Sequence, residues 1–361
     1  MTPDLFQTND RRVNADMVQL ARASRGMTQA EAADAASVTQ ALLSKIENKL
    51  VVNPSEDIVA AFARALRYPV DFFYQTGRTH GLPQYHYRKR SKLGAKTLAT
   101  IQAVINIRRQ HVQKLVRSVD REIHRGIPQI DLDETNMTPA QVAEKMREYW
   151  MVPRGPLGDV TELVETAGGI VILSDFGTRF LDAISFRLPG LPPLFFMNRD
   201  VPGDRYRFTL CHELGHMIMH NGPGDDETME GQADAFAAAF LMPAADIRPQ
   251  LADVNLPKLG RLKPVWRVAI KALVRRAYDL KMITPHQYKY MNMDYNKAGY
   301  NAGEPFPVEQ EQPTTLSNLI DHHMRQLGYS VQEMAQTLLL EAEEFKQAYL
   351  PRGRIELVVS N

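Results

Sequence analysis

The sequence lacks the features of a secreted or membrane protein. Cysteine occurs once in 361 residues, as Cys211, which excludes an internal disulfide framework and fits a reducing compartment. No run approaches the ~18–20 uninterrupted apolar residues that a membrane span needs. The first residues contain no apolar signal-peptide core. We therefore expect a cytoplasmic protein with no membrane partner, and its length predicts two or three domains.

Net charge is also nearly absent, at +1, but the two ends of the chain differ in sign. Residues 1–130 carry 20 Lys and Arg against 11 Asp and Glu, whereas residues 131–361 carry 23 against 31. A basic first part points to nucleic acid as a partner. The alternative is that short basic segments are simply solvated.

Residues 14–74 predict a compact run of short helices, because apolar residues recur at helical spacing. The candidate N-caps are Asn14, Thr28, Thr39 and Ser55. We expect an all-α domain over residues 1–76, followed over 77–130 by a basic linker and a long helix. Apolar residues at three- and four-residue steps follow that helix, namely Leu98, Ile101, Ile105, Val112, Leu115 and Val119. They suit a homodimer seam or, equally, packing on the chain's own domains.

From about residue 131 the pattern changes to a mixture of helices and strands. GGIVILSDF (168–176), DAISFRL (182–188) and PLFFMN (193–198) are short β-rich runs bounded by turn residues. Amphipathic helices precede and follow them. We therefore predict an α+β domain over 131–300 and a helical C-terminal extension over 301–361. PLFFMN is either an edge strand against which a substrate lies extended or an internal buried strand.

The segment RFTLCHELGHMIMH places two histidines, His212 and His216, four residues apart. On a helix both imidazoles share one face and can hold one ion. Glu213 lies about 100° further round the helix, where it can reach a water held by the metal. Two nitrogen ligands, an open position and a carboxylate base are what a metal hydrolase needs.

The next predicted helix supplies two carboxylates, Glu230 and Asp234, beside its apolar face. Carboxylates aimed at a core are costly unless they are paired or bind metal. We predict Glu230 as the third metal ligand, and Asp234 as the hydrogen-bond partner that fixes the tautomer of a ligand histidine. The alternatives are a solvated helix edge, or one of the acidic residues 225–227 replacing Glu230.

Two neighbouring side chains, His220 and Cys211, are weaker candidates for a role in the metal site. His220 is roughly 12 Å from His212 along a straight helix, too far to join the same ion, so we expect it to line the cleft or pack beneath it. Cys211 faces away from His212 and is expected to be a small buried residue rather than a redox group.

These blocks together resemble the ImmA/IrrE family of metallo-endopeptidases over about residues 137–300. The matching stretches are RFTLCHELGHMIMH, the run from Glu230 to Pro243, PVWRVAIKALVRRAYDLKMI, and the preceding TPAQVAEKMREYW…GGIVI. Residues 14–74 resemble the XRE-family helix-turn-helix through LARASRGMTQAEAA and VTQALLSKIEN. The chain departs from the metallopeptidase pattern at Cys211, Asp234 and Ala269.

The resemblance implies a zincin fold with Zn²⁺, or alternatively Mn²⁺, bound by His212, His216 and Glu230, with Glu213 as base and proton shuttle. It also implies cleavage of a partner repressor or antitoxin in a stress or prophage response. We therefore expect a DNA-binding, zinc-dependent endopeptidase that regulates transcription. The alternatives are a transcription factor whose zincin-like domain senses without cutting, and an antitoxin-like protein that sequesters a toxin.

In a helix-turn-helix the second helix enters the major groove of double-stranded DNA, and here it is expected at about 39–48. The residues expected to face DNA are Gln40, Ala41, Ser44 and Lys45. Gln40 can read adenine, and by resemblance Gln29 is expected to hold a phosphate. Backbone contacts are expected from Lys49 and from the basic residues Arg88, Lys89, Arg90 and Lys92. The alternative is a module for protein contacts only.

Overall fold

The computed structural model describes residues 12–76, 79, 81, 93–119, 122–220, 222 and 225–350. The chain divides into two compact units. The first contains the described residues between 12 and 81, between 93 and 119, and from 317 to 350; the second contains those from 122 to 316. No helix in these described ranges is long and apolar enough to cross a bilayer. The sequence predicted four consecutive segments, whereas the two units group residues that pack together and are not consecutive. The division into four segments therefore stays a prediction.

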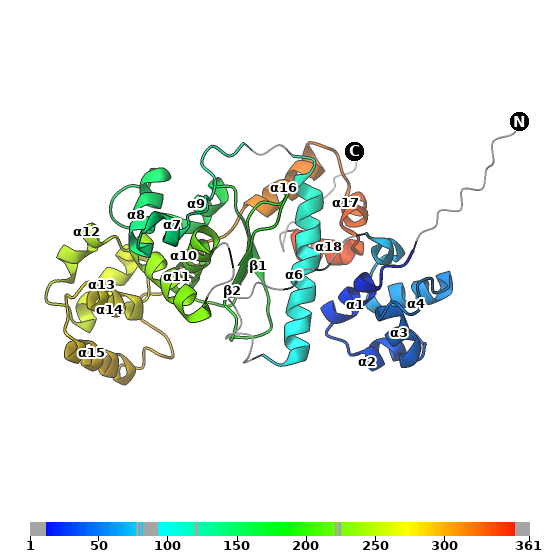
Figure 1. Ribbon diagram of the computed structural model, residues 1–361, viewed down its shortest axis with the longest axis horizontal. Helices are drawn as coiled ribbons and strands as arrows, with labels where there is room; N and C mark the ends of the chain where they lie inside the picture. The colour runs from blue at the N-terminus through cyan, green and yellow to red at the C-terminus, as the bar shows by residue number, and fades with distance from the viewer. Residues whose placement is uncertain are drawn as a thin grey trace, which may run out of the picture. The chain divides into compact units, whose positions relative to one another are not determined.

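The first unit begins with a run of short helices (Figure 1). They are α1 (Ala15–Ser24), α2 (Gln29–Ala35), α3 (Gln40–Glu47), α4 (Glu56–Leu66) and the 3₁₀ helix η1 (Val70–Tyr74). The side chains of Asn14, Thr28 and Thr39 each accept a backbone N–H at a helix start. Ser55 makes no such bond. Gly26 has a φ of 65°, which allows the chain to turn between α1 and α2.

The long helix α6 (Ala95–Val116) packs along α1 and against α17 (Val331–Leu338). The central residues of its apolar seam are buried within the single chain, namely Ile101, Ile105, Val112 and Leu115. Their burial favours the intrachain alternative. Homodimerisation stays a prediction.

The C-terminal extension belongs mostly to the first unit. It forms α16 (Thr315–Arg325), α17 and α18 (Ala342–Tyr349). The His111 Nδ1 atom lies 2.6 Å from the Tyr349 hydroxyl. Arg25 donates to both carboxylate oxygens of Glu344 at 2.8 and 2.7 Å. The helices after residue 317 are therefore part of the core that supports the helix-turn-helix.

The second unit contains a three-stranded sheet in the order β1-β3-β2. The strands are β1 (Ile170–Ser174), β2 (Ala183–Phe186) and β3 (Leu194–Asn198), with β3 parallel to β1 and antiparallel to β2. The edge-strand alternative for 193–198 is wrong: β3 is central and every residue in it is buried. A strand buried on both faces reads as a continuous apolar run, which is why PLFFMN did not reveal its position.

The second unit also contains helices, of which α9 and α10 pack on the sheet. They are α7 (Leu132–Thr135), α8 (Pro139–Tyr149), α9 (Val160–Thr166), α10 (Gly203–Met219), α11 (Asp226–Leu241), α12 (Ala244–Ile247), η3 (Arg248–Leu251), α13 (Leu256–Trp266), α14 (Ile270–Asp279) and α15 (Pro285–Lys297). Helix α10 packs on β2, β3, α9 and α11, and α11 also packs on α8. The observed class is therefore an all-helical unit joined to an α+β unit, as predicted.

An irregular segment, residues 303–314, ties the N-terminal half of α10 in place; we call it the strap. The buried Lys263 ammonium lies 2.6 Å from Asp204 on α10 and 2.9 Å from Glu304 on the strap. Arg207 on α10 pairs with the buried Glu311. A Cβ added at Gly203 would collide with the strap backbone at residues 308–309, so glycine is required there. The strap thus fixes the helix that carries both candidate histidine ligands.

Candidate metal centre

Helix α10 brings His212 and His216 together. Their Nε2 atoms lie 3.1 Å apart, and both residues are buried. The helix ends at His220, whose φ of −115° and ψ of 96° turn it out of the helical path. The spacing of four residues therefore places both imidazoles on one helix face, as expected.

Helix α11 brings Glu230 to the same point. Its Oε1 lies 3.2 Å from His216 Nε2, and its Oε2 lies 3.7 Å from His212 Nε2. Among the described residues these three form a group whose ligand atoms lie within 4.8 Å of one another. Asp225, from the acidic loop, instead caps α11 by accepting from the Thr228 amide.

The three candidate ligands fit a cation with tetrahedral coordination. The separations of 3.1, 3.2 and 3.7 Å bracket the about 3.3 Å expected between ligands that each lie ~2.0–2.1 Å from zinc. When both histidines carry their protons on Nδ1, two imidazole lone pairs and a carboxylate converge. Such a cluster of acceptors is stabilised by a positive ion, so these residues could hold one.

Asp234 orients His212. Its Oδ1 lies 2.8 Å from His212 Nδ1, so the imidazole donates to the carboxylate and its Nε2 lone pair is directed toward the candidate ligand group. The Asp234 side chain is 63% exposed, so the cost of burying a carboxylate, from which its role was inferred, does not apply to it. The contact is the expected one, although the premise of burial was wrong for this residue.

His220 and Gln232 extend the site in a way that sequence reasoning missed. His220 Nδ1 lies 2.8 Å from His216 Nδ1, and His220 Nε2 lies 2.9 Å from Gln232 Oε1. Burial lowers the pKa of His220 to about 4. The distance argument correctly leaves His220 outside the ligand group, but it overlooked this contact. The spacing of His216 and His220, again four residues, was the available signal.

Ser185 contacts the candidate base, and the sequence held no signal for it. Its hydroxyl donates to Glu213 Oε2 at 2.6 Å, and both residues are fully buried. Ser185 comes from β2, the edge strand that packs on α10. The hydroxyl holds the carboxylate of Glu213 in one orientation beside the ligand group.

Two small residues in the motif allow close packing. A Cβ at Gly215 would lie 3.1 Å from the Phe236 ring on α11, so glycine lets α11 approach closely enough to deliver Glu230. Cys211 is buried, and burial raises the pKa of its thiol. It is the small buried residue that the sequence predicted, and it contributes no ligand to the group.

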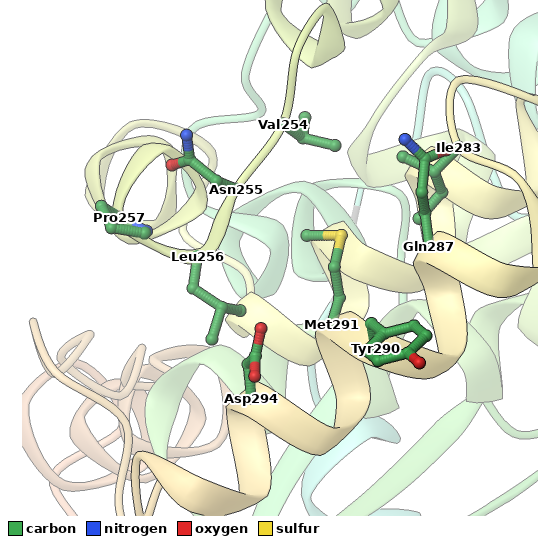
Figure 2. A pocket seen from close by; sticks show the side chains of 9 residues that line it. All are labelled: Val254, Asn255, Leu256, Pro257, Ile283, Gln287, Tyr290, Met291 and Asp294. Carbon is green, nitrogen blue, oxygen red and sulfur yellow. The ribbon is translucent and has the colours of Figure 1, made fainter.

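A separate cavity of about 440 Å³ lies between the start of α13 and helix α15 (Figure 2). Leu256 and Met291 provide apolar lining, and Asp294 and Asn255 provide polar groups. None of the three candidate metal ligands, His212, His216 and Glu230, lines this cavity.

In the first unit, α3 presents the residues expected to face DNA. Gln40, Ala41 and Lys45 are exposed and Ser44 is half-buried, whereas Leu43 and Ile46 are buried. The Gln29 amide donates to Glu47 at 2.7 Å. Lys49 pairs with Asp16 at 3.0 Å. The basic residues 88–90 and 92 lie outside the described residues.

Comparison with known protein families agrees with this geometry. Residues 166–278 match the model of the IrrE N-terminal-like domain, a peptidase family, and residues 18–73 match a helix-turn-helix family. The chain joins a helix-turn-helix domain to an ImmA/IrrE-type domain. No curated protein matches the sequence. The IrrE-like match runs from before β1 into α14 and contains all three candidate ligands. The helix-turn-helix match contains α2 and α3.

Proposed function

We propose that the protein is a DNA-binding, zinc-dependent endopeptidase that cleaves a partner repressor or antitoxin in a stress or prophage response. The observation that carries the proposal is the pairing of Glu213, buried and held by Ser185, with a ligand group that fits zinc. Binding alone would not need an oriented carboxylate beside the ligands. Mn²⁺ is the second metal to test.

Each residue then has a defined task. His212, His216 and Glu230 hold the metal, and Asp234 fixes the tautomer of His212. A bound zinc ion would polarise the scissile carbonyl and lower the pKa of a coordinated water. Glu213 accepts a proton and delivers it to the leaving amine, as a general acid–base.

The edge strand β2 offers a place for an extended substrate. Asn198 donates to the Asp182 carbonyl at 2.7 Å, so in an antiparallel pair the alternate residues Ala183 and Ser185 direct their backbone groups away from β3. A peptide that adds to this edge would pair with those groups. Its chain would then run beside Glu213, which the Ser185 side chain contacts.

Co-expression with candidate partners tests the function. Wild type or Glu213→Ala is produced with each repressor or antitoxin encoded nearby, and fragments are identified by mass spectrometry. A defined fragment that appears only with the wild type supports the endopeptidase. Equal cleavage by both proteins, or no cleavage by a zinc-loaded wild type across several partners, contradicts it and favours a non-cleaving sensor.

Ser185→Ala is expected to lower kcat for the cleaved partner by about tenfold with little change in KM, because general-base catalysis contributes ~10²–10⁴-fold and depends on geometry. Zinc content should stay the same. Ser174→Ala is the matched control, since Ser174 is also a buried strand serine but bonds a main-chain carbonyl. An unchanged kcat for Ser185→Ala would contradict the role in orienting the base.

Gln40→Ala is expected to weaken binding to a selected operator by ~1–3 kcal/mol and to relax base preference at one position. The operator is first selected from a random DNA library, and affinity is then measured at fixed salt. Gln326→Ala, an exposed glutamine in the same unit, serves as the control. Unchanged specificity would remove Gln40 from base recognition.

A further inference from the structure

The two candidate ligand histidines have different partners behind them. His212 Nδ1 lies against the carboxylate of Asp234 at 2.8 Å. His216 Nδ1 lies against another imidazole, His220 Nδ1, also at 2.8 Å. His220 Nε2 in turn lies 2.9 Å from the amide oxygen of Gln232. His212 therefore has an anionic hydrogen-bond partner, whereas His216 contacts the first of two neutral side chains that are linked to each other.

The direction of donation along this series of hydrogen bonds follows from the groups at its two ends. If His216 Nε2 binds a metal, the proton of that neutral ring is on Nδ1 and must be donated to His220 Nδ1. His220 then carries its own proton on Nε2 and donates it to Gln232 Oε1, which can only accept. Both hydrogen bonds of the series then form in one arrangement of protons, with both rings neutral.

We propose that His220 and Gln232 form a neutral relay that positions His216 and tunes the affinity of the site for metal. This inference rests on the proposed metal site. Partners behind a ligand imidazole set its orientation and basicity, and their loss typically costs 10–100-fold in metal affinity. His220 and Gln232 are positioning residues, since neither belongs to the ligand group.

The relay joins two helices at the site. His220 lies at the end of α10, and Gln232 lies on α11 one turn or less from both Glu230 and Asp234. Gln232 therefore acts on His216 while Asp234 acts on His212, from one helix. A carboxylate at position 232 would give both ligands an anionic partner and raise the electron donation of His216 to the metal.

The test measures zinc affinity of the full-length protein by competition with a chromogenic chelator. His220→Ala is expected to weaken zinc binding by about 10–100-fold, and Gln232→Ala by a smaller factor. His220→Gln, whose amide oxygen can accept from His216, should restore part of the loss. Gln232→Glu should tighten zinc binding. His286→Ala removes an exposed histidine on α15 and is the matched control.

A spectroscopic readout separates positioning from folding. With Co²⁺ in place of zinc, His220→Ala and Gln232→Glu should shift the visible ligand-field bands, whereas His286→Ala should not. Unchanged zinc affinity and unchanged Co²⁺ spectra in the His220 and Gln232 variants would overturn the relay. Failure of the wild type to bind zinc, or binding that survives His212→Ala, would instead overturn the metal site itself.

Discussion

Glu230→Ala protein is expected to bind zinc more weakly than wild type by a factor beyond the roughly 10–100-fold that outer partners contribute. The reason is geometric: Glu230 supplies the only carboxylate of the three-residue ligand group found among the described residues. Two histidines 3.1 Å apart then remain for an ion that prefers four ligands. Zinc per chain is measured by atomic emission after dialysis, and cleavage of the partner should disappear with it.

Glu213→Gln provides the matched comparison for this prediction. The amide keeps the shape of the side chain and can still accept from Ser185, but it cannot take up a proton at neutral pH. Zinc binding should persist while cleavage falls by about 10²–10⁴-fold. Loss of zinc in Glu213→Gln would make Glu213 a ligand, and full zinc retention in Glu230→Ala would exclude Glu230 as one.

Glu311→Ala is expected to destabilise the second unit by about 3–5 kcal/mol, because removing one partner of a buried ion pair leaves an uncompensated charge. Arg207 and Glu311 have side chains that are 0% and 1% exposed. The Glu311 carboxylate also accepts from the backbone amides of Val160 and Thr161 at the start of α9, both at 3.0 Å. The substitution therefore releases the strap from both α9 and α10.

Tryptophan fluorescence during urea unfolding measures this effect selectively. The chain has two tryptophans, Trp150 and Trp266, and both lie in the second unit. Glu309→Ala, on the same strap but exposed, should leave the urea midpoint nearly unchanged. Equal midpoints for the two variants would show that the buried pair does not stabilise the unit.

Much of the candidate site could be predicted because its parts are local in the sequence. His212, Glu213 and His216 lie within five residues on one helix, and helical geometry alone places both histidines on a common face. Glu230 and Asp234 lie one turn apart on the next helix. The exposed face of α3, which is expected to contact DNA, follows in the same way from its N-cap and its apolar spacing.

Contacts between elements distant in sequence could not be predicted. Ser185 and Glu213 are 28 residues apart and belong to different elements, and their meeting depends on which strand occupies the sheet edge. The apolar composition of 193–198 was equally compatible with an edge or a central strand. The role of residues 317–350 in the first unit likewise appears only through contacts such as Arg25 with Glu344, which lie 319 residues apart.

The sequence by itself thus determined the candidate ligand motif and the helices that carry it, because a repeat of three to four residues is set by backbone geometry. Only the tertiary structure decided which side chains contact these candidate groups: Ser185 contacts the candidate base Glu213, and His220, held by Gln232, contacts the candidate ligand His216. Such partners depend on how a strand and two helices pack, and packing is determined by the whole core rather than by any local pattern.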